Sequence, residues 1–431
     1  MMASKRGPKS LPLTRLAAPE QLAVWLDDPA FGALSRIGIL SRSGPDSVRF
    51  SYESAWLKHP GAFALDPSLS LSAGDFFPRD SNFGVFLDSC PDRWGQVLMK
   101  RRELVDAKAQ ARTRRELRAW DFLLGVQDVT RMGALRFSAI NDTDSPTFLA
   151  NEALAAPPVA QLGALQLVAL ELSRKRQDDL SLLTQWLKVL VAPGASLGGA
   201  RPKANLIGDK QSLWIAKFPA ADDDSDMALC EKLVHDLAQQ CGINVPPSCL
   251  ERIGHGYHTF LVQRFDREQG KRRFFISAMA LLNKTDKEEA SYLDMAQFIA
   301  THGSPAHIAD DLRELFRRVV FNTVIANRDD HLRNHGFLRV PEGWRLAPAF
   351  DMNPSGKRDS HVLALDDTDT SPNLATVLDT AEFYRLNVRQ ARDIANGVIT
   401  VVGQWQHHAK RLGLSAEERS VLEDLFLLTM P

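Results

Sequence analysis

The chain has 431 residues, of which 44% are hydrophobic and 24% are charged, and its formal net charge is −1 at pH 7. This length allows two or three domains with a sizeable buried core, and the composition is that of a folded globular protein rather than a disordered one. A net charge so close to zero gives no global reason to expect binding to nucleic acid or to an anionic membrane.

The cysteines and the hydropathy pattern indicate a soluble cytoplasmic protein. The four cysteines form no CxxC pair and do not cluster with histidines, which is typical of reduced residues buried as small hydrophobes. The first residues, MMASKRGPKSLPLTRL, are positively charged, but no apolar block of signal-peptide length follows them. No run approaches the roughly 18 uninterrupted apolar residues of a membrane-spanning helix, so we expect no membrane partner.

The first third of the chain predicts a β-rich unit followed by helices. Residues 1–35 have a mixed pattern and are assigned to an N-terminal segment. From residue 36, RIGILSRSGPDSVRFSYESAWL alternates apolar and polar positions around a Ser-Gly-Pro-Asp turn, which predicts a β-hairpin. Residues 83–125 have helical periodicity. Within them, 100–118 carry eight basic and three acidic residues, a run that a solvated helix face explains better than an anionic partner does.

A polar, Ala/Pro-rich stretch at 141–160 predicts a boundary between units, and a glycine-rich loop lies beyond it. The loop PGASLGGARPKAN (193–205) has glycines whose backbone freedom permits a phosphate cradle, and Arg201 and Lys203 add positive charge. It matches neither a Walker A sequence nor GxGxxG. Taken alone, such a loop is more often a structural turn.

A lysine in a predicted strand follows this loop. In LWIAKFP, Ile215 and Phe218 fit a buried strand, and Lys217 within it either meets an anion such as a nucleotide phosphate or extends to water at the strand end. The sequence leaves these two readings equal. Glu231 lies on the next predicted helix, 226–241, where an ordinary exposed acid is slightly favoured over a partner for Lys217.

The segment ANRDDHLRNHG (326–336) concentrates polar side chains directly after a predicted amphipathic helix at 308–325. It fits three interpretations. A polar loop is the commonest, a metal site could use His331 and His335, and a kinase catalytic loop would place Arg328-Asp329 five residues before Asn334. By itself the segment favours the polar loop.

Distant residues change this balance. After Asn334, GFLRVPEGWRLAPAFD predicts a strand, a turn, a second strand and then Asp351, which the hairpin carries back toward Asp329. The chain presents five features in the order found in protein kinases. They are the glycine loop, the strand lysine, the helix, the R-D-x-x-x-x-N loop and the aspartate after the hairpin. Phosphoryl transfer needs an oriented hydroxyl, which Asp329 could hold, and oxygen ligands for Mg²⁺, which Asn334 and Asp351 could supply. The two histidines alone do not make a metal-hydrolase site.

This ordered set resembles the HipA-like serine/threonine kinase family, the toxin kinases of bacterial toxin–antitoxin pairs. SLGGARPKA is similar to the family loop S-x-x-G-A-x-x-K, WIAKFP to its lysine strand, VQRFDR to its hinge and DDHLRN to its D-x-H-x-x-N catalytic loop. The resemblance implies an α+β fold with a two-lobed protein-kinase-like core. It divides the chain into a β-rich N-terminal subdomain at 36–140, an N-lobe at 160–266 and a mainly α-helical C-lobe at 267–431.

The resemblance also implies roles for individual residues. It makes Asp329 the catalytic aspartate, supported by Arg328 and His331, and gives Asn334 and Asp351 to Mg²⁺. It assigns the following residues to ATP: Lys217, Gln263, Phe265, Asp266, and the loop residues Ser196, Leu197, Gly198, Gly199 and Ala200. Ser196 matches the position of regulatory autophosphorylation in the family, which is reasonable because a phosphoserine would put about −1.5 to −2 charge where the γ-phosphate must lie.

Two departures from the family pattern stand out. Arg201 occupies a position where many relatives have Gln and could alter phosphate binding. The loop aspartate is doubled, so Asp330 could compete with its neighbour for metal, although Asp329 keeps the correct distance to Asn334.

The leading hypothesis is an ATP- and Mg²⁺-dependent serine/threonine protein kinase. The resemblance implies a protein substrate, in known cases an aminoacyl-tRNA synthetase, and a HipB-like DNA-binding antitoxin through which the chain meets DNA indirectly. One alternative is a kinase acting on a small molecule. Another is an antitoxin-docked co-repressor with little catalysis, for which the basic run at 100–118 is the hint. The target itself depends on surface shape outside these motifs.

Overall fold

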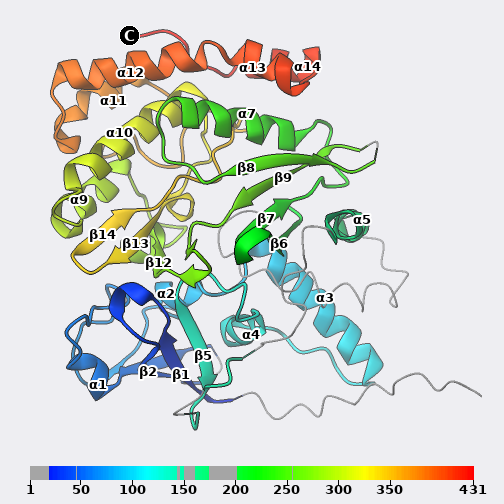
Figure 1. The fold of residues 1–431 in the computed structure, drawn as a ribbon, viewed down its shortest axis with the longest axis vertical. Helices are drawn as coiled ribbons and strands as arrows, with labels where there is room; N and C mark the ends of the chain where they lie inside the picture. Colours follow the sequence, from blue (N-terminus) through cyan, green and yellow to red (C-terminus); the bar gives the residue numbers. More distant parts are fainter. Residues whose placement is uncertain (1–18, 45, 143–145, 150–160, 174–200, 255) are drawn as a thin grey trace, which may run out of the picture.

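The computed structural model describes residues 19–44, 46–142, 146–149, 161–173, 201–254 and 256–431. Figure 1 shows three stacked regions, with an N-terminal sheet at one end, a second sheet in the middle and helices at the other end. Mixed α+β architecture with a β-rich N-terminal region and a helical C-terminal region was predicted, and this fold class is confirmed. Among the described residues, no helix is long and apolar enough to cross a membrane.

The N-terminal sheet has five antiparallel strands in the order β4-β3-β2-β1-β5. Its strands are β1 (Gln21–Leu26), β2 (Ser35–Arg42), β3 (Val48–Tyr52), β4 (Asp75–Phe76) and β5 (Leu135–Ala139). The predicted hairpin is confirmed as β2–β3, which alternates buried and half-buried positions along β3. The sheet begins at β1, inside the segment that the sequence sets apart as 1–35. β1 pairs with both β2 and β5.

Four helices connect the strands of this region: α1 (Ser54–Leu57), α2 (Gly84–Leu87), α3 (Arg93–Ala109) and α4 (Ala119–Gly125). The basic run at 100–118 forms the second half of α3 and the extended segment after it. Many of its charges are already paired, because Glu103 contacts Arg112 and Arg115, and Arg118 contacts Asp46. The basic side chains of the run are exposed or half-buried, as predicted for a solvated face, but the helix ends at Ala109 and the rest of the run is not helical.

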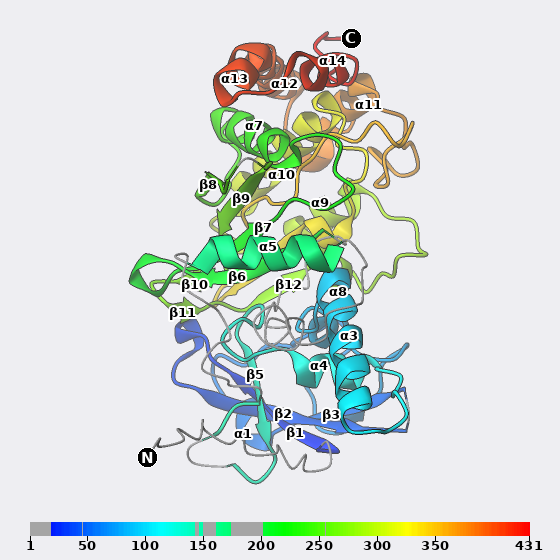
Figure 2. The same ribbon diagram turned by 90° about the vertical axis from the view of Figure 1, so that its right-hand side faces the viewer.

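The middle sheet has four antiparallel strands in the order β6-β7-β9-β8. They are β6 (Lys203–Ile207), β7 (Leu213–Lys217), β8 (Ser248–Arg252) and β9 (His258–Gln263). Helix α7 (Met227–Gln240) covers one face of this sheet, and α5 (Leu162–Ser173) lies near its other side (Figure 2). The strand and helix predicted around Lys217 and 226–241 correspond to β7 and α7.

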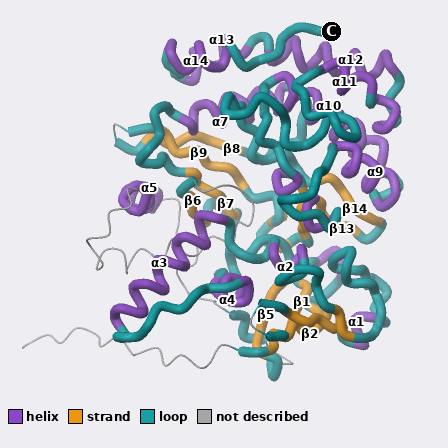
Figure 3. Tube along the Cα trace, turned by 180° about the vertical axis from the view of Figure 1, so that it is seen from behind, coloured by secondary structure: helices purple, strands orange, loops and turns teal. Residues whose placement is uncertain are grey.

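The C-terminal region combines a three-stranded sheet with a helical layer. The sheet contains β12 (Phe275–Ser277), β13 (Gly336–Val340) and β14 (Gly343–Leu346), and a short hairpin of β10 (Arg267–Glu268) and β11 (Lys271–Arg272) precedes it. The helices are α8 (Ala278–Leu281), α9 (Tyr292–His302), α10 (Ile308–Val324), α11 (Leu374–Asp379), α12 (Val388–Val402), α13 (Trp405–Leu412) and α14 (Ala416–Glu423). Figure 3 shows α9 to α14 gathered away from the N-terminal sheet, whereas α8 contacts α2 of the N-terminal region.

Helix α10 forms the centre of this region. Its apolar residues recur at helical spacing and are buried against α9 and α12, which confirms the helix predicted at 308–325 (Leu312, Leu315, Phe316, Val319 and Val320). Asp310 and Asp311 lie in its first turn, where their negative charges interact favourably with the helix dipole and stabilise the helix. The chain leaves this rigid support directly into the polar segment 326–336, so the loop begins from a fixed point.

Candidate functional site

Lys217 lies at the end of β7 with an ion pair on each side. Its Nζ is 2.6 Å from Oδ1 of Asp351 and also contacts Oε1 of Glu231, while its side chain is 13% exposed. Burial alone would favour the neutral amine, but Asp351 and Glu231 raise the pKa of Lys217 above its usual value. The ammonium therefore stays charged at physiological pH, and the alternative of a lysine extending to water is wrong.

Glu231 lies on the buried face of α7 and is 8% exposed. The slight preference for an exposed acid was wrong, because the side chain turns inward to Lys217. The signal was available in the sequence: Ala228, Glu231 and His235 follow the helical spacing of a buried face. Asp226 fixes the start of this helix by accepting a hydrogen bond from the backbone N–H of Leu229 at 3.3 Å.

Asp351 follows the β13–β14 hairpin, as predicted, and reaches the lysine from the opposite side. Its backbone has a φ of 60°, a left-handed conformation that residues other than glycine rarely adopt and that is often found at functional sites. Burial opposes ionisation, but Lys217, with a contribution from Lys203, lowers the pKa of Asp351 to about 2. The carboxylate is thus available as an anionic oxygen ligand.

One cavity is lined by five residues that the family resemblance assigns to ATP or Mg²⁺. Lys217, Gln263, Phe265, Asp266 and Asp351 all line it. The Phe265 ring stacks on Phe350, with ring centroids 5.5 Å apart and an angle of 28° between the planes. Apolar walls with a few convergent charges are typical of a small-molecule site.

Met132 also lines this cavity, although it belongs to the N-terminal region. It belongs to a small buried hydrophobic cluster with Phe275, Leu338 and Ala347. Phe265 packs against this cluster. Nothing in the sequence around Met132 indicates this position, because the contact joins segments about 130 residues apart. The cavity wall therefore depends on both regions of the chain.

Asp266 lies in the cavity wall, but its carboxylate is fully occupied by buried donors. Oδ2 accepts hydrogen bonds from Nη2 of Arg264 at 2.6 Å, from Nη1 of Arg267 at 2.6 Å and from the backbone N–H of Gly133 at 2.8 Å. These arginines keep the pKa of Asp266 below its usual value despite complete burial. A direct role at the nucleotide stays a prediction.

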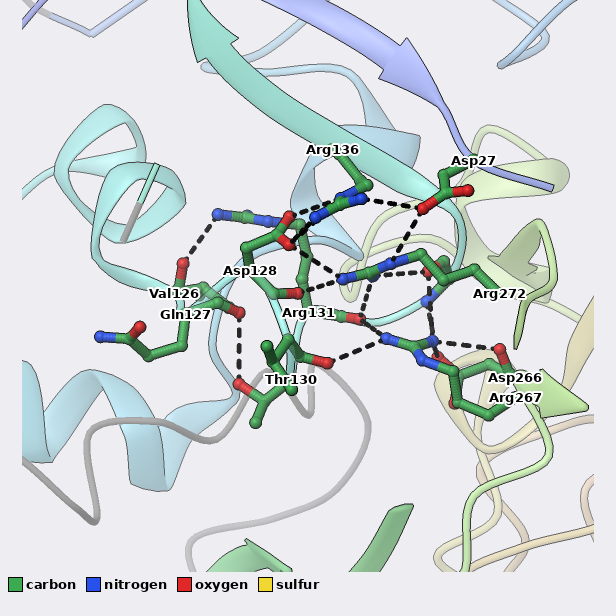
Figure 4. A network of polar contacts seen from close by, with 12 residues as sticks. Asp27, Val126, Gln127, Asp128, Thr130, Arg131, Arg136, Asp266, Arg267 and Arg272 are labelled. Atoms are coloured by element: carbon green, nitrogen blue, oxygen red, sulfur yellow. Dashed lines mark hydrogen bonds and ion pairs between the residues drawn. The ribbon is translucent and has the colours of Figure 1, made fainter. Parts of the chain in front are cut away.

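The surroundings of Asp266 form a polar network between the two regions (Figure 4). From the core side, Arg267 and Arg272 donate to the backbone carbonyls of Arg131. From the N-terminal side, Asp128 pairs with Arg136 and Arg272. The network fixes the segment that carries Phe265 and Asp266 against β5 and the turn before it.

The predicted catalytic loop presents Asp329 to solvent. Its side chain is 59% exposed, and Oδ1 lies 2.9 Å from Nε of Arg358. Arg328 donates from Nη1 to the carbonyl oxygen of Arg358 at 2.7 Å, which fits the supporting role expected for it. Asp329 is not among the residues that line the cavity around Lys217.

Asn334 ends a short 3₁₀ turn, Leu332–Asn334, in the same loop. It is 7% exposed, and its Oδ1 accepts no hydrogen bond from any described residue. Its backbone N–H donates to the carbonyl oxygen of His331 at 2.8 Å, so His331 braces the turn. The loop also contacts the segment that follows Asp351, because the backbone N–H of Ser355 donates to the carbonyl oxygen of Ala326 at 2.9 Å.

Asp330 is buried and hydrogen-bonded to protein groups, so the expectation that it could compete for metal is wrong. One of its partners is His335, which the loop sequence offered as a candidate metal ligand. Within the described part of the chain, no group of three or more metal-binding side chains is preassembled.

The predicted phosphate loop, including Ser196, Leu197, Gly198, Gly199 and Ala200, lies outside the described residues. The two cations after it have protein partners. Arg201 pairs with Asp223 at 2.7 Å, and Lys203 pairs with Asp92 at 2.8 Å. Lys203 nevertheless lines the cavity beside Lys217, its register partner across the β6–β7 pair.

The fold and the site together define a two-lobed, kinase-like core joined to a β-rich N-terminal subdomain. Comparisons with known proteins give its family. The model of the HipA N-terminal domain matches residues 22–138, and that of the HipA-like C-terminal domain matches residues 195–406. The chain belongs to the HipA-like family.

Two similar proteins illustrate the relationship. The HipA chain of a Shewanella oneidensis MR-1 toxin–antitoxin system, solved with HipB and its operator DNA, is 17% identical, and the match covers 94% of each chain with a TM-score of 0.64, which shows the fold. A Haemophilus influenzae protein named "Putative kinase" is 29% identical over 181 residues, which are 37% of this chain and 52% of that protein. The match thus spans about half the length of this curated relative.

Proposed function

We propose that this chain is an ATP- and Mg²⁺-dependent serine/threonine protein kinase. The observation that carries the proposal is the convergence of Glu231, Lys217 and Asp351 at the cavity between the middle sheet and the C-terminal region. A half-buried lysine whose charge is supported by two carboxylate partners fits a site where nucleotide phosphates bind. Membership in the HipA-like family supports the same chemistry.

The residues of the chain divide the work as follows. The ammonium of Lys217 neutralises charge on the phosphates, and Glu231 holds it in place. The hinge segment Gln263–Phe265 supplies backbone groups and an apolar wall to adenine. Asp329 accepts a hydrogen bond from the acceptor hydroxyl and orients it in line with the γ-phosphate, a contribution made through positioning and proton acceptance.

The loop and hairpin fit a bound Mg²⁺ ion. Asp351 offers a carboxylate of low pKa, and Asn334 offers an amide oxygen that accepts no hydrogen bond from the described residues. Both are hard oxygen ligands. Mg²⁺, when bound, would neutralise phosphate charge at this position.

The phosphate loop carries the proposed regulation. Phosphorylation of Ser196 by the chain itself would place negative charge where the γ-phosphate binds and would switch the enzyme off. This proposal comes from the resemblance of the loop to the family's S-x-x-G-A-x-x-K loop, since Ser196 lies outside the described residues. Phosphosite mapping of the wild type and of the Lys217→Met variant after incubation with Mg-ATP tests it, because autophosphorylation at Ser196 requires an active site.

We also propose that the biological setting is a toxin–antitoxin pair. The substrate would be a protein, with an aminoacyl-tRNA synthetase as the first candidate, and the partner a HipB-like DNA-binding antitoxin. The structural similarity to the Shewanella HipA chain supports such a partner. The paired charges of the 100–118 run give no separate support for a DNA-binding role.

A labelling experiment tests the enzymatic proposal. The purified chain is incubated with radiolabelled ATP, Mg²⁺ and a bacterial lysate, and the labelled proteins are identified by mass spectrometry. We expect phosphoserine or phosphothreonine on a small number of lysate proteins. Labelling only of protein-free metabolite extract would overturn the protein-kinase assignment in favour of a small-molecule kinase.

A further inference from the structure

Asp329 and Asp330 are neighbours with opposite environments. The Asp329 side chain is 59% exposed, whereas Asp330 is 2% exposed. The alternation continues along the loop, with His331 half-buried and Leu332 buried. Because the loop alternates between the solvent side and the core side, whatever holds Asp330 inside also decides which way Asp329 points.

Three hydrogen-bond donors hold the Asp330 carboxylate, and all three bind the same oxygen. Its Oδ2 accepts hydrogen bonds from the hydroxyl of Tyr292 at 2.5 Å, from Nδ2 of Asn322 at 2.9 Å and from Nε2 of His335 at 2.7 Å. An ionised carboxylate can only accept, so His335 must carry its proton on Nε2. All three donors are at least 95% buried.

The donors come from three different parts of the C-terminal region. Tyr292 is the first residue of α9, whose start is fixed by a capping box between Ser291 and Asp294. Asn322 is in the last turn of α10, and its side-chain oxygen also accepts a hydrogen bond from Nδ2 of Asn327 at 3.1 Å. His335 precedes β13. Asp330 therefore joins two helices and the hairpin strand at one point within the loop.

We propose that Asp330 is a positioning residue for the catalytic loop, fixing the direction of Asp329 and the place of Asn334 through its bonds to Tyr292, Asn322 and His335. It acts from behind the loop and touches no reacting group. Of the two adjacent aspartates, Asp329 would take part in phosphate transfer and Asp330 would hold the loop in position. This inference rests on the proposed kinase function and adds a residue to that site.

A buried carboxylate can also be purely structural, so the test needs a readout that loss of fold does not change. Asp311 is the matched control. It is 4% exposed, lies on the same helix α10 as Asn322, and holds Arg345 and the backbone N–H of Leu346 rather than the loop. Both carboxylates are buried hydrogen-bond acceptors, but of the two only Asp330 belongs to the predicted catalytic loop.

The experiment compares Asp330→Ala, Asp330→Asn and Asp311→Asn with the wild type. ATP affinity and the number of binding sites are measured by calorimetry, and the rate of phosphate transfer is expressed per nucleotide-binding site. Misplacing a catalytic group by about 1 Å can cost about 100-fold in rate. We expect a loss of that order for Asp330→Ala with ATP affinity unchanged, a smaller loss for the isosteric Asp330→Asn, and a wild-type rate per site for Asp311→Asn.

Two results would overturn the inference: a rate per site for Asp330→Ala within about twofold of the wild type, or a parallel loss of ATP affinity. If neither Asp330 variant folds, Tyr292→Phe takes their place, since it removes one donor and keeps the ring. Its rate per site should fall with ATP affinity unchanged, and a wild-type rate would overturn the inference. A wild-type chain that transfers no phosphate would instead contradict the proposed function, so the two failures are distinguishable.

Discussion

Lys217 and Asp351 are 134 residues apart in the sequence, yet their side chains meet at 2.6 Å and both line one cavity. Lys217 comes from the end of β7, and Asp351 is delivered by the β13–β14 hairpin. The pair joins the middle sheet to the C-terminal region at the point where nucleotide phosphates would lie. Their mutual contact also keeps both groups charged.

Replacing Lys217 by Met should weaken Mg-ATP binding. A hydrogen bond to a charged group contributes about 1.5–3 kcal/mol, so the affinity should fall roughly 10- to 100-fold. Titration calorimetry measures this change. Lys210→Met is the matched control, because Lys210 is an exposed lysine in the β6–β7 connection and does not line the cavity. An unchanged affinity in Lys217→Met would remove the lysine from the phosphate site.

The pKa of Asp351 gives a prediction about stability and pH. Because its folded pKa of about 2 lies below the ordinary value of 3.8, its contribution to stability is complete above the ordinary value and is lost as pH falls through about 2. Urea unfolding of the wild type and Asp351→Asn should give a constant difference in free energy between pH 5 and about 8. The difference should narrow only below about pH 4. A difference that already shrinks between pH 7 and 5 would contradict the ionised, lysine-paired carboxylate.

The interdomain network around Asp266 predicts a large stability effect. Asp266→Asn removes the carboxylate that Arg264 and Arg267 share, leaving two arginines buried without an anionic partner. Breaking such a buried pair costs about 3–5 kcal/mol of unfolding free energy. Asp46→Asn serves as the control, since the pair of Asp46 with Arg118 is exposed and its loss should leave the denaturation midpoint unchanged. Equal denaturation midpoints for Asp266→Asn and Asp46→Asn would show that the Asp266 carboxylate does not stabilise the fold through this network.

Asn334→Ala should raise the Mg²⁺ requirement without unfolding the loop. The Oδ1 atom accepts no hydrogen bond from the described residues, so its removal breaks no such protein bond. Loss of a metal ligand should raise the Mg²⁺ concentration for half-maximal transfer by about tenfold or more. Transfer rates over a Mg²⁺ titration measure the shift, and thermal unfolding checks the fold. A wild-type Mg²⁺ dependence would take Asn334 out of the metal site.

Much of the local structure was predictable because it depends on periodicity and turn chemistry. The alternation of β2–β3 around its Gly-Pro-Asp turn and the apolar stripe of α10 are local patterns, and both elements form where expected. The hairpin that delivers Asp351 follows from its Pro-Glu-Gly turn. Five residues that the family resemblance assigns to ATP or Mg²⁺ line one cavity, and of these only Asp351 is positioned by this hairpin.

The missed features depend on contacts between distant segments. The spacing to Asn334 singles out Asp329 for the catalytic role, but the inward turn of Asp330 depends on the Tyr292 hydroxyl, 38 residues before it, which no local pattern indicates. Met132 reaches the cavity only because the N-terminal region docks on the core. The pairing of Lys203 with Asp92 likewise joins two regions that the sequence treats separately. The inward position of Glu231 is a different case, because the helical spacing of the buried residues of α7 could have predicted it from the sequence.

The most direct test of the account is the Asp329→Asn variant. Asp329 is exposed and lies outside the lining of the cavity around Lys217, so its substitution should leave ATP affinity and thermal stability at wild-type values. The rate of γ-phosphate transfer to protein should fall by a factor of about 100 or more, because the acceptor hydroxyl loses its orienting base. Wild-type transfer by Asp329→Asn, with equal ATP affinity, would contradict the assignment of this loop as the catalytic loop of a kinase.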